Sequence, residues 1–256
     1  MDLKEIFRIE RCLEASGYFD VSRIAREIYN FSLENNIPIE SILERISTQE
    51  PWEYIQGFVE FKNRRFVVTK DTLIPRVESE QMVDIAVDLI GRKEIEKVID
   101  IGTGSGCIII SIAEESKEKD ISFVGVDISE EALAIARMNS DGGILFKQRD
   151  LIKEKDLDSN TLVVANLPYI PTAMYEGLDR SVKDFEPRIA LDGGKDGLLY
   201  YRKLFKIFRD SKKEIHLIIE IEPSTKDDIV KLLKDTPFQI FKDFREKERF
   251  LLLHFT

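Results

Sequence analysis

An asparagine, a proline and a tyrosine stand close together where a strongly apolar segment ends. The stretch VVANLPYI passes from its apolar residues into Asn166, Leu167, Pro168 and Tyr169. The side-chain oxygen of Asn166 and the backbone carbonyl of Leu167 are hydrogen-bond acceptors, and the Tyr169 ring offers a face for stacking. Pro168 fixes the turn and favours an extended conformation for the residue before it. These groups suit a flat, polar substrate that carries N–H bonds.

Two acceptors beside an aromatic ring could activate a nitrogen whose lone pair is delocalised, as in an amide or an aromatic amine. If Asn166 and Leu167 hold its two N–H bonds, the nitrogen can become tetrahedral and aim its lone pair at a methyl donor. Such a transfer needs positioning and electrostatics, with no covalent intermediate, and no metal site is expected. We therefore assign Asn166, Pro168 and Tyr169 as catalytic, and Asn166, Leu167, Pro168 and Tyr169 as substrate-binding. The alternative is a strand that ends in a proline turn.

A glycine-rich turn could form the other half of such a site. In VIDIGTGSGC, Gly102, Gly104 and Gly106 lie between an apolar segment and a helical one. Glycine permits a tight turn and lets the backbone approach a ligand closely. The spacing G-x-G-x-G differs from the G-x-G-x-x-G of dinucleotide-binding folds, and no Lys-Ser or Lys-Thr follows as in a phosphate-binding loop. With Thr103 and Ser105, these glycines are predicted to bind a cofactor.

Two acidic residues around the loop, Asp127 and Asp100, favour a positively charged nucleoside as that cofactor. Asp127, at the end of the next predicted strand, can accept hydrogen bonds from both hydroxyls of a ribose. Asp100, just before the loop, could meet a cationic group. Asp150 could accept a hydrogen bond from an adenine amino group, with Leu151 against the ring. A solvated acid in a loop remains the alternative for Asp100 and Asp150.

The elements that must position these residues read as a sheet covered by helices. KVIDIG, SFVGVDIS, TLVVANL and EIHLIIEI are apolar runs separated by helical segments, which predicts parallel strands with helices on both faces. FQIFKDF and RFLLLHF face each other across REKE as a hairpin would, so we expect the last strand to be antiparallel. In such doubly wound sheets, ligands bind at the carboxyl ends of the strands, where the motifs fall.

Two smaller parts precede the sheet. Residues 1–50 are predicted to form a helical domain, because apolar residues repeat at i, i+3, i+4 and i+7 from Val21 and again from Ile39. Residues 51–75 are predicted to be a linker, with GFVEF and RRFVVT as a hairpin around KN. Residues 76–256 then form the catalytic domain, which gives an α/β fold with two appended elements.

The composition restricts the partners. The formal net charge is -10 over 256 residues, and neither the first 70 residues nor the remainder is basic. Because nucleic-acid binders normally present a cationic face to phosphates, nucleic acid is an unfavoured partner. No apolar run is long enough to span a bilayer, and the charged N-terminus differs from a secretory signal. With only Cys12 and Cys107, far apart in sequence, we expect a reduced, cytoplasmic protein without membrane partners.

Taken together, the motifs resemble those of a known enzyme family. DIGTGSGC, Asp127 and NLPYI resemble class I S-adenosylmethionine-dependent methyltransferases that carry an Asn-Pro-Pro-Tyr motif. EPWEYIQG, TLIPRVESE and FEPRIALDGGKDGLLYYR narrow the resemblance, over roughly residues 48–220, to the PrmC/HemK family. That family methylates the N5 nitrogen of the glutamine in the Gly-Gly-Gln motif of peptide chain release factors. The resemblance implies S-adenosylmethionine as the cofactor and release factors as protein partners.

The resemblance also implies a fold and contacts. It implies a Rossmann-like, seven-stranded catalytic domain behind a helical domain and a short β-hairpin. Cofactor contacts are expected at Gly102–Gly106, Asp127, Leu151 and Asn166, and substrate contacts at the four residues NLPY. Ile74–Arg76 should line the cleft near the methyl donor, which makes Arg76 a predicted substrate-binding residue.

Some features depart from the family pattern. Leu167 stands where the family usually has proline; the carbonyl acceptor is retained, but stiffness is lost and an N–H is added. NLPY is also typical of enzymes that dimethylate adenine N6 in ribosomal RNA. An adenine-N6 methyltransferase acting on RNA or DNA is therefore the alternative function, against which the acidic charge and EPWEYIQG count. GGKDG, residues 193–197, reads by itself as a flexible turn, although its place in the family also allows it to edge the cleft.

Overall fold

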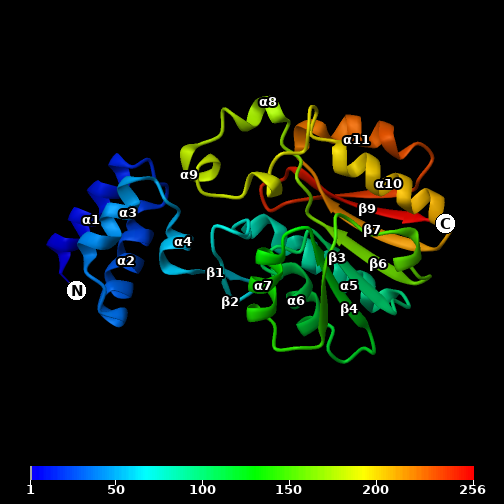
Figure 1. Cartoon of the computed structure of the whole chain (residues 1–256), viewed down its shortest axis with the longest axis horizontal. Coiled ribbons are helices and arrows are strands. Elements are labelled where there is room, and N and C mark those ends of the chain that lie inside the picture. Colours follow the sequence, from blue (N-terminus) through cyan, green and yellow to red (C-terminus); the bar gives the residue numbers. More distant parts are fainter. Residues whose placement is uncertain (1) are drawn as a thin grey trace.

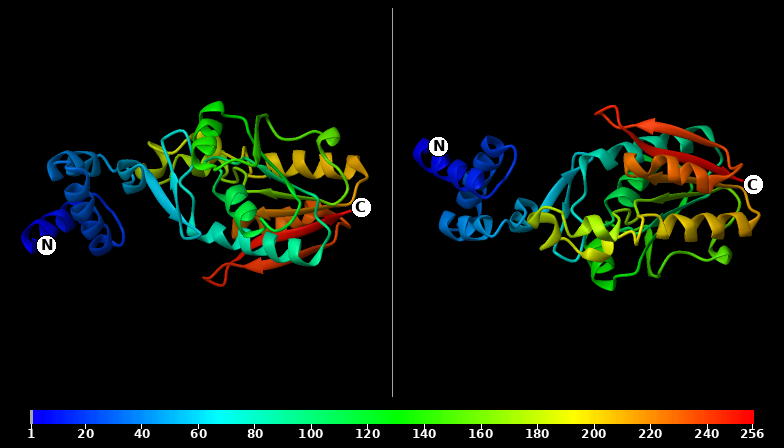
Figure 2. Two further views of the ribbon diagram at one scale, coloured as in Figure 1. Left: turned by 90° about the horizontal axis from the view of Figure 1, so that it is seen from below. Right: turned by 90° about the horizontal axis from the view of Figure 1, so that it is seen from above.

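Three helices at the start of the chain pack around an apolar core of their own. The computed structural model describes residues 2–256, and its first helices are α1 (Leu3–Ala15), α2 (Val21–Asn35) and α3 (Ile39–Ser47). Their apolar residues, such as Ile9 and Ile46, share one face of each helix and bury one another. Figures 1 and 2 show these helices at one end of the molecule, away from the sheet. The predicted helical domain begins at Met1, which lies outside the described residues.

A short helix and a hairpin connect these helices to the sheet. They are α4 (Trp52–Gln56), β1 (Phe58–Phe61) and β2 (Arg64–Val67), and the two strands pair antiparallel as predicted. Lys62 and Asn63, between the strands, have φ values of 48° and 58°, which suit a two-residue type I′ turn. Asn139, which ends α7 (Glu130–Asn139), accepts from Val67 N at 2.7 Å and donates to the Ser105 carbonyl at 2.9 Å. The hairpin is thereby tied to the glycine loop.

Seven strands form the main sheet, in the order β5-β4-β3-β6-β7-β9-β8. The strands are β3 (Lys97–Ile101), β4 (Ser122–Asp127), β5 (Ile144–Gln148), β6 (Thr161–Ala165), β7 (Ile215–Glu220), β8 (Phe238–Lys242) and β9 (Glu248–Phe255). β3 to β7 pair in parallel, and β9 lies antiparallel between β7 and β8. The predicted parallel sheet with an antiparallel last strand is confirmed. Its order reverses between β3 and β6, the position where such sheets bind ligands.

Helices cover both faces of this sheet (Figure 1). α5 (Glu80–Arg92), α6 (Cys107–Glu115) and the hairpin pack on the face that presents Val98 and Val164. α10 (Leu199–Ser211) and α11 (Lys226–Leu233) pack on the face that presents Ile99 and Val163. β6 is buried along its whole length, as expected for a central strand covered on both sides. Across residues 2–256, no helix is long and apolar enough to cross a membrane.

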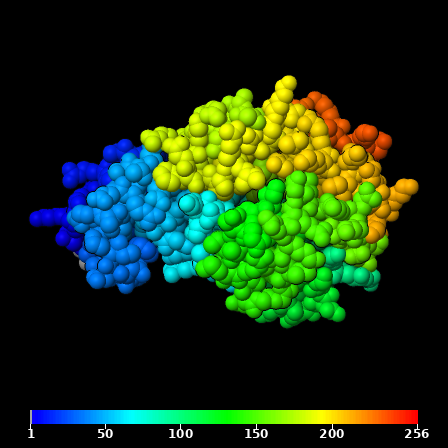
Figure 3. Space-filling model, viewed as in Figure 1, coloured from blue at the N-terminus to red at the C-terminus, as the bar shows by residue number. Residues whose placement is uncertain are grey.

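A long connection leads from β6 to α10 and folds back on its own beginning. It carries α8 (Thr172–Tyr175), α9 (Arg180–Lys183) and the 3₁₀ turn η3 (Arg188–Ala190), and Figure 3 shows it in yellow-green on the surface beside the N-terminal helices. Ile170 pairs with Asp192, and Gly193 N donates to the Ile170 carbonyl at 2.8 Å. A Cβ on Gly193 would lie 2.7 Å from the Pro168 carbonyl oxygen. Because only glycine fits at positions 193 and 197, where a Cβ would overlap the backbone of Pro168 or Tyr169, the segment 193–197 is a packed support of NLPY and not a flexible turn.

Candidate active site

A cavity lies at the carboxyl ends of four neighbouring strands. We call it the strand-end cavity, and its wall includes these predicted site residues: Gly102, Gly104, Asp127, Asp150, Leu151, Asn166, Leu167 and Pro168. Other parts of the wall come from the segment Asp71–Leu73, from Ile128, and from Ile189, Ala190 and Tyr200 of the long connection and α10. Most of this second group lies within the segments TLIPRVESE and FEPRIALDGGKDGLLYYR, which carry the family resemblance, but the sequence assigned none of these residues to the site. The fold thus brings Gly102 and Gly104 of the glycine loop and Asn166, Leu167 and Pro168 of the NLPY motif to one space, whereas Tyr169 lies off the wall of this cavity.

The glycine loop turns sharply from β3 into α6. Gly102, Gly104 and Gly106 have φ values of 73°, 54° and 81°, which glycine adopts without strain. The N–H groups of Gly102 and Thr103 donate to the Val126 carbonyl at 2.9 and 3.0 Å, so β4 holds the start of the loop. A Cβ on Gly104 would meet no protein atom within 4 Å. Since Gly104 lines the strand-end cavity, its backbone is open to a ligand there.

Asp127 ends β4 and closes one side of the strand-end cavity. Its two carboxylate oxygens accept hydrogen bonds from the backbone N–H groups of Gly104 at 2.9 Å and Ser129 at 3.0 Å. Each oxygen keeps a lone pair for a further donor. Burial raises the pKa of Asp127, while these backbone donors oppose the shift. The carboxylate is therefore held in one orientation, ready to accept from two hydroxyls.

Asp100 lies beneath the glycine loop and not on the wall of the strand-end cavity. It is 1% exposed, and its Oδ2 accepts from the Thr103 hydroxyl at 2.6 Å. Its Oδ1 is buried without a hydrogen-bond partner among residues 2–256. Burial raises the pKa of this carboxyl to about 7. Four of the predicted cofactor-binding residues lie off the cavity wall and shape the turn beneath it: Asp100, Thr103, Ser105 and Gly106.

Asp150 and Leu151 reach the strand-end cavity from the loop after β5. Leu151 is buried and has a φ of 68°, an uncommon value for a residue other than glycine. The Asp150 carboxylate is exposed and lies 3.8 Å from Lys203 Nζ. An apolar side chain and a carboxylate therefore stand next to each other at this end of the cavity.

Asn166 is held from behind by two elements distant in sequence. Its Nδ2 donates to Glu220 Oε2 at 3.0 Å and to Ser79 Oγ at 3.3 Å. Glu220 ends β7, and Ser79 ends the 3₁₀ turn η1 (Val77–Ser79). Because Ala165 pairs with Ile219, the next residues of the two strands, Asn166 and Glu220, lie side by side. With both N–H bonds turned towards this side, Oδ1 of Asn166 remains able to accept a hydrogen bond from a ligand.

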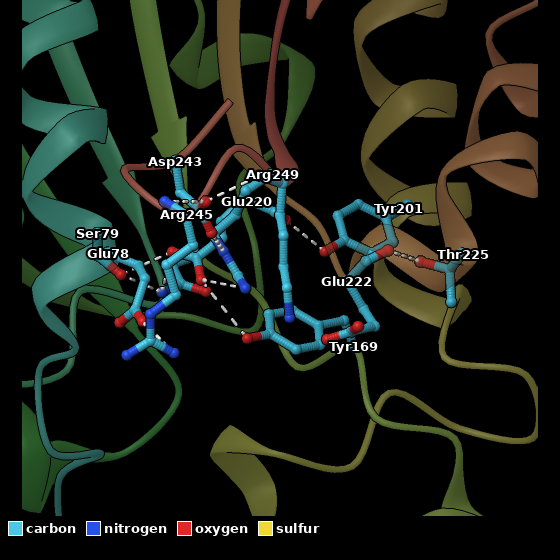
Figure 4. Close-up of polar contacts among 12 residues, drawn as sticks. Glu78, Ser79, Tyr169, Tyr201, Glu220, Glu222, Thr225, Asp243, Arg245 and Arg249 are labelled. Carbon is cyan, nitrogen blue, oxygen red and sulfur yellow. Dashed lines mark hydrogen bonds and ion pairs between the residues drawn. The ribbon is translucent and has the colours of Figure 1, made fainter. Parts of the chain in front are cut away.

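Glu220 is the centre of a buried polar cluster that the sequence did not reveal. The carboxylate is 1% exposed and also accepts from the Ser79 hydroxyl at 2.6 Å and the Tyr169 hydroxyl at 3.5 Å, and Arg249 Nη1 lies 3.8 Å away (Figure 4). We call Glu220, Ser79, Asn166, Tyr169 and Arg249 the Glu220 cluster. Burial raises the pKa of Glu220, and the donors around it oppose that shift. One signal was present: a single acid ends the apolar strand IHLIIE.

The side chain of Leu167, within the NLPY motif, packs against the glycine loop. Its side chain is 3% exposed and belongs to the apolar core of one face of the sheet. A Cβ on Gly102 would lie 3.5 Å from Leu167 Cδ2 and 3.6 Å from the Asn166 carbonyl oxygen. The leucine therefore fills the space between the two loops, which sets their separation.

Arg76 lies away from the strand-end cavity. Its guanidinium pairs with the buried carboxylate of Glu186, which also accepts from Ile74 N at 3.2 Å. Arg76 lines a separate groove of about 850 Å³, whose wall also includes Trp52 and residues of α2 and β1. The structure therefore associates Arg76 with the surface between the N-terminal helices and the sheet.

Comparison with known proteins finds methyltransferases by family model and by sequence. Residues 92–242 match a family model described as a methyltransferase domain. The release factor glutamine methyltransferase of Bacteroides thetaiotaomicron is 32% identical over 223 residues, which cover 83% of this chain and 79% of that protein. The release factor glutamine methyltransferase of Fusobacterium nucleatum is 30% identical over 251 residues, covering 92% and 70%. Among solved structures, the catalytic domain of hMettl16 in complex with MAT2A 3'UTR hairpin 6 shares the fold, with a TM-score of 0.58 at 16% identity over 75% of each chain.

Proposed function

We propose, because the chain belongs to the release factor glutamine methyltransferase family, that it methylates the N5 nitrogen of the glutamine in the Gly-Gly-Gln motif of peptide chain release factors. The methyl donor is S-adenosylmethionine. The observation that carries the proposal is that Asn166, Leu167 and Pro168 line the same cavity as the glycine loop and Asp127. An acceptor site and a donor site therefore share one space. We place the reaction in the cytoplasm, where release factors meet ribosomes.

The strand-end cavity fits the donor in the chemistry of its wall. S-adenosylmethionine supplies a methyl group on a positively charged sulfur. Asp127 would accept from the ribose hydroxyls, Asp150 from the adenine amino group, and Leu151 would pack against the adenine ring. The backbone at Gly104 leaves room for close approach, since a Cβ there would project into the cavity. Asp100, Thr103, Ser105 and Gly106 would contribute by holding the loop in shape.

Asn166 and Leu167 would hold the substrate amide for attack. Oδ1 of Asn166 and the carbonyl of Leu167 accept its two N–H bonds, which reduces delocalisation of the nitrogen lone pair. When bound, S-adenosylmethionine would supply the methyl group and take the electron pair of its carbon–sulfur bond, and the substrate nitrogen would release one proton to solvent. Tyr169 stacks on the flat amide, and Pro168 stiffens the turn. Preorganised acceptors of this kind act mainly by position and electrostatics.

Mass spectrometry tests this proposal directly. A recombinant release factor is incubated with the chain and S-adenosylmethionine, and the peptide that contains Gly-Gly-Gln is sequenced. We expect one added methyl group on the glutamine and none in a Gly-Gly-Ala variant of the factor. Equal labelling of both factors would contradict the substrate assignment. The NLPY motif also suits adenine, so the same assay with ribosomal RNA tests the alternative, which methylated adenine N6 would support.

A further inference from the structure

We propose that Glu220 is a positioning residue for methyl transfer, which orients the Asn166 carboxamide so that Oδ1 faces the substrate nitrogen. Glu220 itself is off the wall of the strand-end cavity and acts through Asn166. The inference rests on the proposed function, since it concerns how the acceptor side of that site is kept in a productive state.

The carboxamide of Asn166 fills nearly the same space in two orientations. A half-turn about its last side-chain bond exchanges Oδ1 and Nδ2, and such terminal torsions are intrinsically soft. With Oδ1 towards the substrate, Asn166 accepts an N–H bond; with Nδ2 there, two donors face each other and the amide is repelled. The geometry on the protein side of Asn166 therefore decides whether the site can bind a substrate nitrogen.

Glu220 selects the productive orientation, because an ionised carboxylate only accepts hydrogen bonds. Its Oε2 lies 3.0 Å from Asn166 Nδ2, and the half-turn would bring two oxygens to that distance. Ser79 cannot compensate, since its hydroxyl proton is directed to the same carboxylate at 2.6 Å. A hydrogen bond to a charged group favours one orientation by roughly tenfold to a hundredfold.

The groups around Glu220 fix its carboxylate, and the donors and the cation among them favour its charged form against the effect of burial, which raises its pKa. Arg249 from β9 lies 3.8 Å from Oε1 and is itself held by Asp243 at 2.9 Å (Figure 4). The Tyr201 hydroxyl donates to the backbone carbonyl of Glu220 at 2.7 Å, which fixes the end of β7. Glu78, the neighbouring acid in η1, forms an ion pair with Arg245, whose Nη1 lies 3.5 Å from Glu78 Oε1. Tyr169 is the remaining titratable group that faces the carboxylate.

The same carboxylate also contacts Tyr169, which lies off the wall of the strand-end cavity. The Tyr169 hydroxyl lies 3.5 Å from Oε1, while Asn166 is bound through Oε2. The first and last residues of the NLPY motif therefore share one anchor, which fixes the spacing between the acceptor oxygen and the stacking ring.

A double-mutant cycle separates this role from simple structural support. Glu220→Gln preserves the volume but offers either an oxygen or an N–H group to Asn166, so kcat should fall roughly tenfold with the Kd of S-adenosylmethionine unchanged. Asn166→Asp places a second carboxylate against Glu220, and kcat should fall about a hundredfold or more. In the double variant the introduced carboxamide donates to the introduced carboxylate. One oxygen again faces the substrate, and kcat should recover about tenfold over Asn166→Asp alone.

Control measurements separate a loss of orientation at Asn166 from a loss of folding or of donor binding. Thermal unfolding and calorimetry with S-adenosylmethionine show whether each variant is folded and binds the donor. Ser79→Ala removes a neighbour of Glu220 but leaves the carboxylate, and its effect on kcat should be smaller than that of Glu220→Gln. Single losses that simply multiply in the double variant would overturn the positioning role. The cycle is run on whichever acceptor mass spectrometry identifies, so an unexpected substrate refutes the proposed function and still leaves the role of Glu220 open to measurement.

Discussion

The two sides of the strand-end cavity are built in opposite ways. The donor side, comprising the glycine loop and Asp127, is held mainly by backbone groups: the N–H groups of Gly102 and Thr103 donate to the Val126 carbonyl of β4 at 2.9 and 3.0 Å. The acceptor side, comprising NLPY and the Glu220 cluster, is held by side chains that lie 54 and 87 residues from Asn166 in sequence. Backbone contacts persist whatever the side chains are, whereas a side-chain cluster can be disabled by one substitution. We therefore expect donor binding and methyl transfer to be separable by mutation.

Asn166→Ala should produce the largest effect and separate the two sides most clearly. It removes the acceptor used mainly in the transition state, so kcat should fall roughly 10²–10³-fold. Single-turnover kinetics measure the loss, and calorimetry should show S-adenosylmethionine still bound. The control is Asn160→Gly before β6, where a φ of 61° suits glycine. Turnover of Asn166→Ala at the parent rate would exclude the acceptor role.

Gly193→Ala should also impair the acceptor side, although Gly193 is not a wall residue of the cavity. The added methyl would lie 2.7 Å from the Pro168 carbonyl oxygen and 2.8 Å from Tyr169 Cα, so the motif must shift. Because small displacements of reacting groups are expensive, kcat should fall about tenfold to a hundredfold. In the matched variant Gly177→Ala, the nearest atom to the methyl is the Met174 carbonyl oxygen at 3.6 Å, and activity should be retained. Similar kinetics for both variants would show that the packing of residues 193–197 is irrelevant to transfer.

Asp127→Asn should affect the donor side alone. An amide in place of the carboxylate weakens hydrogen bonds from the ribose hydroxyls, and the Kd of S-adenosylmethionine should rise roughly tenfold. At saturating donor, kcat should remain close to that of the parent. Asp120→Asn, ahead of β4 on the surface, is the control. A loss of kcat without a change in Kd would remove the distinction between the two sides.

Asp100→Asn should have the smallest effect on methyl transfer, and it should act instead on stability and its pH dependence. The pKa of Asp100 is about 7 in the folded protein against an ordinary 3.8, so the unfolded chain releases this proton at lower pH. The stabilisation from Asp100 is thus complete below its unfolded pKa and is lost as the pH rises through about 7. The variant should lose less unfolding free energy between about pH 5 and about pH 8, with a difference of about 3 kcal/mol. Denaturant unfolding measures it, and identical pH profiles would contradict it.

The difference between the donor side and the acceptor side also explains what could be predicted from the sequence. Strand periodicity, the glycine spacing and the position of Asp127 are local features, and they predicted the sheet and the donor side. The NLPY motif was visible, but Ser79 and Glu220 were not, because their contacts depend on the register of β6 against β7 and on where η1 packs. The places of Asp100 beneath the loop and of Arg76 in a separate groove could not be predicted either, because sequence position does not determine which way a side chain points; their roles in binding stay predictions.

The position of β9 within the sheet has a consequence for the order in which the protein folds. It follows every other strand in sequence, yet it lies between β7 and β8 and supplies Arg249 to the Glu220 cluster. During synthesis the glycine loop and NLPY emerge first, while β7 keeps an unpaired edge and Glu220 lacks its cation. A growing chain therefore carries both motifs before β9 has been made. We expect methyl transfer to require the pairing of β9 with β7, because only then does Arg249 reach Glu220.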